Sequence, residues 1–296
     1  MSQAPAPSRL TRLRHDAEQA AARFPALLAE AERIAASVAH GVHGRRRAGQ
    51  GETFWQYRHH RPEDGARSVD WRRSAQGDHL YIREVEWEAA NAIHFWRDGS
   101  AGMQLHSPGL PSKVERASVA LMAIASLLNR GGERLSVLGE TGRARAGRAG
   151  FETVNRALAL GDGHADSVEA ADLPRHARLV IASDFLDPVE TWQARLSRFA
   201  AQGASGALLR IIDPAEDDFP FKGRTRFEAA SGGGDSLLFG RAEDARTAYR
   251  EAWSHHGAQL NDLARQYGWR LITHRTDRPA ASAVLALYQA LSEPRS

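Results

Sequence analysis

The sequence predicts an α/β fold: a doubly wound, mostly parallel sheet preceded by a lobe of helices and short strands. From residue 91 onward, short apolar runs alternate with segments whose apolar residues recur at helical spacing. That alternation is typical of a parallel sheet covered on both faces. Several of the apolar runs stop at an acidic residue, namely at Asp98, Asp184 and Asp213. Open sheets of this class bind ligands at the carboxyl ends of their strands, so we expect the functional groups there.

The first 40 residues are predicted to form a helical lead-in. Met1 to Ser8 is rich in Pro and Ala and is expected to be disordered, whereas Arg9 to Arg23 is expected to be helical. Pro25 suits the first turn of a second helix, for which Gly41 is a suitable stop. This helix is expected to pack across the following domain, because its apolar residues lie on one face: Leu27, Leu28, Ala31, Ile34, Ala35 and Val38.

Residues 41–90 are predicted to form a small lobe of loops and short strands packed on the sheet. Thr53 to Tyr57 and His79 to Trp87 are rich in aromatic and β-branched side chains, which favour strands. Between them, Pro62 to Gly65 has the composition of a turn.

Residues 91–296 contain the predicted sheet domain. Strands are expected at Asn91–Trp96, Arg134–Leu138, Leu179–Ala182, Ala207–Ile212 and Trp269–Thr273. Helices are expected at Lys113–Asn129, Phe151–Leu160, Val189–Ala200, Glu243–Tyr267 and Ala280–Leu291. The segment from Phe219 to Phe239 interrupts the alternation, and its Gly triplet with flanking aromatic residues predicts a hairpin-like excursion.

Composition narrows the class of protein. The chain has 296 residues, 42% of them hydrophobic and 25% charged, and a net charge of +3. Cysteine is absent, which excludes disulfides and thiolate metal sites. No apolar run approaches the ~20 residues that cross a bilayer, and the amino terminus has no apolar signal-peptide core. We therefore expect a cytoplasmic protein without membrane insertion. Only Lys113 and Lys222 are lysines; all other residues in the Lys and Arg count are arginine.

Common catalytic signatures are missing from the sequence. It contains no His-Glu-x-x-His zinc motif, no Gly-x-Ser-x-Gly nucleophile elbow and no P-loop. We therefore expect that the chain is not an enzyme.

A series of short motifs lies between Gly41 and Ser100. In order, they are Gly49-Gln50-Gly51-Glu52, Tyr57-Arg58, Arg61-Pro62-Glu63-Asp64, Arg67, Val69-Asp70-Trp71-Arg72-Arg73-Ser74-Ala75, and Leu80-Tyr81-Ile82-Arg83-Glu84 with Glu86. Together they resemble the signature of the bacterial domain-of-unknown-function family fifty-eight. The resemblance extends from about Gly41 to the end of the chain. It implies a von Willebrand factor A-like domain that begins at Asp98, and a MoxR-type AAA+ ATPase as partner.

The same resemblance implies a degenerate metal-ion-dependent adhesion site. In von Willebrand factor A-like domains an Asp-x-Ser-x-Ser loop binds Mg²⁺ together with a Thr and an Asp from later loops. Asp98 and Ser100 match that loop, Gly102 replaces its last Ser, and Asp184 fits the distal carboxylate. For the Thr, both Thr141 and Thr153 lie in the right region. We expect at most weak Mg²⁺ binding, which Gly102→Ser should tighten; the alternative is that Asp98 only caps the turn.

The segment around Asp70-Trp71-Arg72 is the most specific local feature. Trp and Arg are typical of the residues that dominate protein interfaces, so Arg58, Asp70, Trp71 and Arg72 are the candidate partner-binding residues. The alternative is an internal tie, in which Trp71 buries a large apolar surface and an arginine masks Asp70. The surrounding arginines, Arg45 to Arg47 included, are nearly balanced by acids, which favours an ion-pair network over a nucleic-acid patch.

These observations predict a non-enzymatic interaction or adaptor protein that works with a MoxR-type AAA+ ATPase in assembly or maturation of a client. No cofactor is expected beyond weakly bound Mg²⁺. The alternative is a nucleic-acid-binding or nuclease-like protein that uses the Arg-rich segment.

Overall fold

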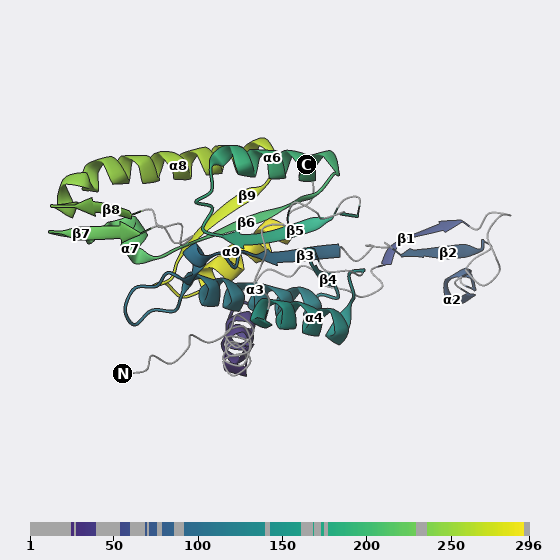
Figure 1. Cartoon of the computed structure of the whole chain (residues 1–296). Coiled ribbons are helices and arrows are strands. Elements are labelled where there is room, and N and C mark those ends of the chain that lie inside the picture. Colours follow the sequence, from purple (N-terminus) through teal and green to yellow (C-terminus); the bar gives the residue numbers. More distant parts are fainter. Residues whose placement is uncertain are drawn as a thin grey trace. The chain divides into compact units, whose positions relative to one another are not determined.

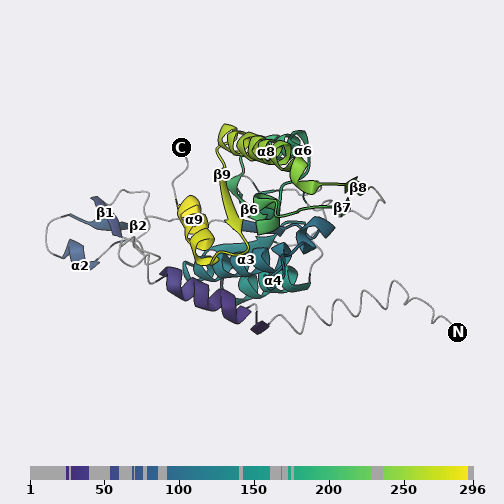
Figure 2. The same cartoon turned by 90° about the vertical axis from the view of Figure 1, so that its left-hand side faces the viewer.

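The computed structural model describes residues 25–26, 28–39, 54–59, 69, 71–75, 79–85, 92–139, 143–160, 168, 173–174, 177–228 and 236–292. The chain is divided into two compact units. One comprises Met1–Val42 with Asn91–Ser296, and the other comprises His43–Ala90. Figures 1 and 2 show the chain from two directions.

The larger unit is built on a sheet of five parallel strands, in the order β4-β3-β5-β6-β9. The strands are β3 (Ala92–Arg97), β4 (Arg134–Val137), β5 (Arg178–Ser183), β6 (Ser205–Ile212) and β9 (Arg270–Arg275). Counted in chain order, the sheet reads 2-1-3-4-5. In doubly wound folds with this order the ligand crevice opens where the order reverses, which here is between β3 and β5. All five predicted strands are confirmed within two residues of their bounds.

Helices cover both faces of this sheet, as predicted (Figures 1 and 2). On one face lie α3 (Lys113–Arg130), α4 (Gly147–Leu160) and α9 (Ala281–Ser292), and on the other lie α6 (Val189–Ala201) and α8 (Arg246–Gln266). Two cores result because successive strand side chains point to opposite faces. Phe95 of β3 belongs to the core under α3, whereas its neighbour Trp96 belongs to the core under α6 and α8.

The amino-terminal helix at residues 28–39 also packs on the first face. Ala31, Ala35 and Val38 are buried in the core that contains α3. Its Glu32 accepts hydrogen bonds from Ser126 (2.9 Å) and Arg130 (2.5 Å) of α3. The predicted packing of this helix is therefore confirmed, while the helix expected at Arg9 to Arg23 lies outside the described residues.

The predicted excursion is confirmed as a hairpin after the short helix α7 (Pro214–Asp218). It consists of β7 (Thr225–Glu228) paired antiparallel with β8 (Ser236–Phe239), and it leads through the 3-10 turn η3 (Ala242–Ala245) into α8. Aromatic packing supports it: Phe219 lies 5.8 Å from Phe227 and 4.7 Å from Tyr249, measured between ring centroids. In Figure 1, α7 and the hairpin extend from the left end of the sheet, where β6 ends.

The unit His43–Ala90 contains an antiparallel pair, β1 (Phe54–His59) and β2 (Tyr81–Val85), and the one-turn helix α2 (Trp71–Ser74). The predicted strands are confirmed. The expectation that Trp71 buries a large apolar surface is wrong, because its exposed fraction is 61%. Val69 and Ser74 are buried instead, and the Ser74 Oγ accepts a hydrogen bond from the Tyr81 N–H (2.9 Å). At the first residue of so short a helix, the Trp71 side chain faces solvent.

Within the described part of the chain, no helix combines the length and the apolar composition that crossing a bilayer requires.

Candidate functional site at the carboxyl edge of the sheet

Asp98 ties the end of β3 to the end of β5. Its backbone N–H donates to the Ala182 carbonyl (2.8 Å), which extends the strand pairing by one bond. Its carboxylate accepts two further hydrogen bonds, from the Ser100 N–H (2.7 Å) and from the Ser183 hydroxyl (2.7 Å). Asp98 therefore caps the turn into the 3-10 helix η2 (Ala101–Gln104), the role considered as the alternative to metal binding.

Asp184 follows β5 and is aimed inward by an unusual turn. The next residue, Phe185, has a φ of 55° and is fully buried, with its ring 4.5 Å from that of Trp192. A non-glycine residue in this left-handed region is uncommon, and for a bulky side chain such as phenylalanine it is an outlier that the surrounding packing must hold in place. Asp184 is 6% exposed, whereas the following Leu186, whose N–H donates to Asp184 Oδ1 (3.2 Å), is 46% exposed.

Lys113 is the cation that Asp184 faces. Its Nζ lies 2.9 Å from Asp184 Oδ2 and 2.5 Å from Glu216 Oε1, and the residue has no exposed surface. The local sequence fixes its place, because Ser112 and Glu115 form a capping box that starts α3 at Lys113. A lysine at the amino end of a helix is disfavoured by the helix dipole, and the two carboxylates offset that cost.

Glu216 is held by a second capping box, at the start of α7. Its Oε2 accepts the Asp213 N–H (2.7 Å), which leaves Oε1 for Lys113. Burial raises the pKa of Glu216, and the nearby Lys113 ammonium opposes that rise. One lysine thus links three segments: the start of α3, the end of β5 and the start of α7.

Asp213 anchors the neighbouring loop and is fully buried. Its carboxylate accepts hydrogen bonds from the Ala215 N–H (2.9 Å), from the Ser107 N–H (2.8 Å) and hydroxyl (2.5 Å), and from the Thr276 hydroxyl (3.4 Å). Burial alone would raise the pKa of Asp213, but these hydrogen bonds outweigh it, and the net pKa is lowered. Asp213 is therefore a structural acceptor that fixes the loop after η2.

We call Asp98, Ser100, Lys113, Asp184 and Glu216 the carboxyl-edge cluster. The structure brings the predicted ligands Asp98, Ser100 and Asp184 to the same edge, but their donor set fits a divalent ion poorly. Asp184 already forms an ion pair with the Lys113 ammonium, and both carboxylate oxygens of Asp98 accept hydrogen bonds. Among the described residues, no group of three His, Asp or Glu side chains is placed to share a metal ion.

Of the three other positions considered for the metal site, Gly102 and Thr153 do not add a ligand. A Cβ at Gly102 would lie 3.0 Å from Asp184 Oδ2, so a serine there would crowd the carboxylate. Thr153 lies on α4, where its hydroxyl donates to the Ala149 carbonyl (2.9 Å). Thr141 lies outside the described residues.

A second buried cation, Arg210 of β6, lies close to the cluster. Its guanidinium carbon is 4.4 Å from the centre of the Trp253 ring, and the residue is 4% exposed. Burial lowers the pKa of Arg210, and the charges of Glu216 and Asp184 oppose that effect. Positive charge from two side chains therefore acts on these two carboxylates.

The predicted partner-binding residues belong to the other compact unit. Trp71 and Arg72 lie on α2 and are exposed. Arg58 lies on β1 opposite Ile82, and nothing is described of its side chain. Asp70 and the Arg45 to Arg47 run lie outside the described residues.

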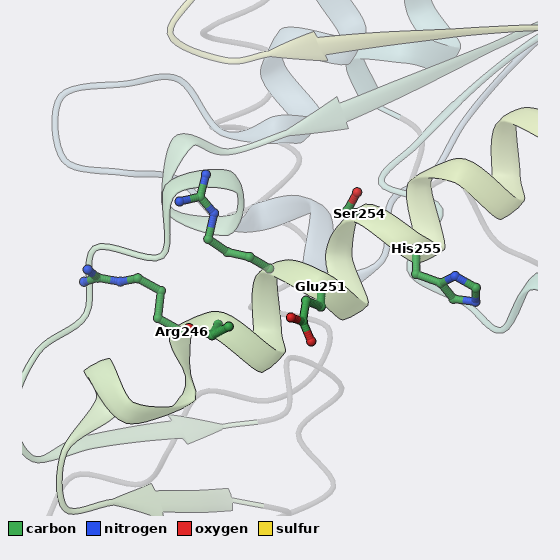
Figure 3. Close-up of a pocket in the computed structure, with 6 residues that line it drawn as sticks. Arg246, Glu251, Ser254 and His255 are labelled. Atoms are coloured by element: carbon green, nitrogen blue, oxygen red, sulfur yellow. The ribbon is translucent and has the colours of Figure 1, made fainter.

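A shallow hollow of about 660 Å³ lies along α8. It is lined by Arg246, Thr247, Arg250, Glu251, Ser254 and His255. Figure 3 shows the labelled side chains of Glu251, Ser254 and His255 pointing in different directions from the helix. These groups do not converge on one point, so the hollow does not have the geometry of a catalytic site.

Sequence reasoning placed Asp98, Ser100 and Asp184 at this edge but did not include Lys113 and Glu216 among the candidates. One available signal was Ser-x-x-Glu at residues 112–115, followed much later by Asp-Pro-x-Glu at 213–216; both are capping boxes. A second signal was the lysine itself, since the chain otherwise uses arginine almost exclusively.

Comparison with known proteins gives a family and a few relatives. The family model described as "Protein of unknown function DUF58" matches residues 56–259. Uncharacterized proteins of Mycobacterium bovis and Mycobacterium tuberculosis are 29% identical over 260 residues, covering 81% of this chain and 80% of theirs. A solved aerotolerance-related membrane protein from Bacteroides fragilis is similar with a TM-score of 0.40 and 12% identity. An uncharacterized membrane spanning protein from Vibrio fischeri has a TM-score of 0.18 and 13% identity. Each match covers 68% of this chain and 98% of the solved one.

The prediction of a cytoplasmic protein is corrected by this comparison. The two solved proteins are named as membrane proteins, so the cytoplasmic assignment is not kept. The error lay in the inference itself, because a sequence without a long apolar run restricts how a chain can cross a bilayer and not where it acts.

Proposed function

The chain belongs to the DUF58 family, and on that premise we propose that it is a non-enzymatic interaction module that docks a MoxR-type AAA+ ATPase at the carboxyl edge of its sheet. One observation carries the proposal. The polar groups of this edge bond to one another, while two large apolar side chains beside them, Leu105 and Leu186, are 45% and 46% exposed. Such a surface is suited to bind a protein rather than to activate a substrate.

Both leucines are held by the backbone of the site. The Leu105 carbonyl accepts the N–H of Lys113 (3.2 Å), and the Leu186 N–H donates to Asp184 (3.2 Å). The main chain of each leucine is therefore held in place relative to the carboxyl-edge cluster. Preorganised apolar groups lose little conformational entropy on binding, which favours affinity.

The non-enzymatic part of the proposal is supported by how the acids are engaged. Asp98, Asp184, Asp213 and Glu216 each accept hydrogen bonds from inside the chain. A general acid or base must reach a proton on the substrate, and side chains committed to internal bonds are poorly placed to do so.

We further infer that the larger unit is a von Willebrand factor A-like domain. The support is the Asp98-Gly99-Ser100 loop at the end of β3, next to Asp184 at the end of β5, where the strand order reverses. The exposed Trp71 and Arg72 support a second contact surface in the His43–Ala90 unit, to which Arg58 and Asp70 would contribute. This chain and the ATPase would together assemble or mature a client, which is a protein or complex of the same cell.

The test is capture of a MoxR-type ATPase from the same organism by the purified chain. Leu186→Asp should weaken capture at least tenfold, because it places a charge in the apolar contact. Leu80→Asp tests the second surface in the same way, since Leu80 is 43% exposed and lies in the other compact unit. Circular dichroism checks that both variants are folded. Capture unchanged by Leu186→Asp would exclude the carboxyl edge, and loss with Leu80→Asp alone would place docking in the His43–Ala90 unit.

A further inference from the structure

The carboxyl-edge cluster has the layout of a cation site that already contains a cation. Oxygen atoms from two carboxylates, Asp184 Oδ2 and Glu216 Oε1, lie within 2.9 Å and 2.5 Å of a single positively charged atom, Lys113 Nζ. The Ser100 hydroxyl borders the same space, since a Cβ at Gly102 would lie 3.0 Å from Asp184 Oδ2 and 3.9 Å from Ser100 Oγ. Carboxylate and hydroxyl oxygens are the ligands that hard divalent cations prefer.

We propose that the Lys113 ammonium is a built-in substitute for a divalent cation, and that its removal converts the carboxyl-edge cluster into a site for Mg²⁺ or Ca²⁺. In the natural chain the lysine joins α3, β5 and α7, the task that a shared metal ion performs in a metal-bound site. The edge is then organised without any ion from solution, at every cation concentration. This inference does not depend on the identity of the docking partner.

Three features support a dedicated cation rather than an ordinary surface ion pair. Lys113 is fully buried, and the side chains of Asp184 and Glu216 are only 8% and 10% exposed. Lys113 stands at the amino end of a helix, where a positive charge is disfavoured unless something offsets it. It is also one of only two lysines, in a chain that uses arginine elsewhere. A compact ammonium on a flexible stem resembles the point charge of a metal ion more closely than a planar guanidinium does.

Once the Lys113 ammonium is removed, the cluster would bind a divalent metal ion weakly. Removal of the ammonium leaves two carboxylates and the neighbouring hydroxyl, with room for water ligands along the path of the lost side chain. Arg210 remains within electrostatic reach of both carboxylates and opposes a second cation. We therefore expect a Kd on the order of 10⁻⁴–10⁻³ M, at the weak end for protein sites.

The experiment compares thermal unfolding of Lys113→Ser with and without about 10 mM CaCl₂ or MgCl₂, against NaCl of equal ionic strength. The divalent salt should raise the Tm of the variant by roughly 3–6 °C, and that of the natural chain by less than about 1 °C. Two controls isolate the site. Lys113→Ser/Asp184→Asn removes a ligand and should lose the gain, and Lys222→Ser removes the other, exposed lysine and should behave as the natural chain.

A folded Lys113→Ser variant whose Tm is indifferent to divalent ions would overturn the proposal. If the variant does not fold in NaCl, its yield of soluble protein on refolding is compared in the two salts. A yield raised by Ca²⁺ or Mg²⁺, but not in the double variant, supports the proposal, and equal yields count against it. Calorimetry on the natural chain gives an independent check: divalent binding there that Asp184→Asn abolishes would also refute it, since the site would then be open to metal with the lysine in place.

Discussion

Replacement of Lys113 by methionine should destabilise the protein strongly at neutral pH. Methionine approximates the volume of the lysine stem but removes the charge, so two carboxylates with almost no exposed surface would face each other without their shared cation. Removing one partner of a buried pair costs about 3–5 kcal/mol. We expect Lys113→Met to lower the free energy of unfolding by that amount. Lys222→Met, at an exposed position, should change it by less than about 0.5 kcal/mol.

The pH dependence tests the cause of that loss. Without the ammonium, the pKa of at least one of the two carboxyls should rise, because each would ionise in a buried site beside a like charge. An acid whose pKa is raised in the folded state adds stability below its unfolded pKa, and this stability is lost as pH rises through the folded value. The deficit of Lys113→Met should therefore shrink between pH 7 and pH 5.

Denaturant unfolding at pH 7 and at pH 5 measures how much unfolding free energy Lys113→Met loses at each pH. A double-mutant cycle with Glu216→Gln should show coupling of about 1–3 kcal/mol, because the second change removes one of the two stranded charges. A deficit below about 1 kcal/mol at pH 7, in the range of exposed pairs, would refute the reasoning. So would a deficit that is the same at pH 5.

Three further predictions concern other residues. The structure reverses the expectation that Gly102→Ser tightens Mg²⁺ binding: the variant should lose about 1–3 kcal/mol of stability, since its Cβ would lie 3.0 Å from Asp184 Oδ2, and a gain in stability or in Mg²⁺ affinity by calorimetry would contradict this. Trp71→Ala should cost less than about 1 kcal/mol in denaturant unfolding, because the side chain is 61% exposed, and a larger cost would mean that Trp71 has a buried partner. Burial lowers the pKa of His274 from 6.5 to about 4, so its contribution to stability is present above pH 6.5 and lost as pH falls toward 4. That contribution is about 3 kcal/mol, and His274→Gln should remove this part of the pH profile in urea unfolding.

The sequence by itself determined the sheet domain to within a few residues. Apolar runs such as Leu179–Ala182 and Ala207–Ile212 are buried on both faces, and this pattern is local, so it can be recognised without the fold. The same holds for the helix at residues 28–39, whose apolar stripe predicted its packing. Asp98 and Asp184 were placed at one edge because parallel strands share their carboxyl ends.

Only the tertiary structure decided which groups meet at that edge. Lys113 pairs with Asp184, which is 71 positions further along the chain, and with Glu216, which is 103 positions further. Such contacts depend on the strand order and on the paths of the connecting loops. The left-handed turn at Phe185 directs Asp184 inward and leaves Leu186 exposed, and nothing in its local sequence specifies that conformation. The exposure of Trp71 was likewise decided by the tertiary structure. Its type predicted burial, but its position at the first residue of a one-turn helix left it exposed, because burial is decided by what packs against a residue and not by its hydrophobicity alone.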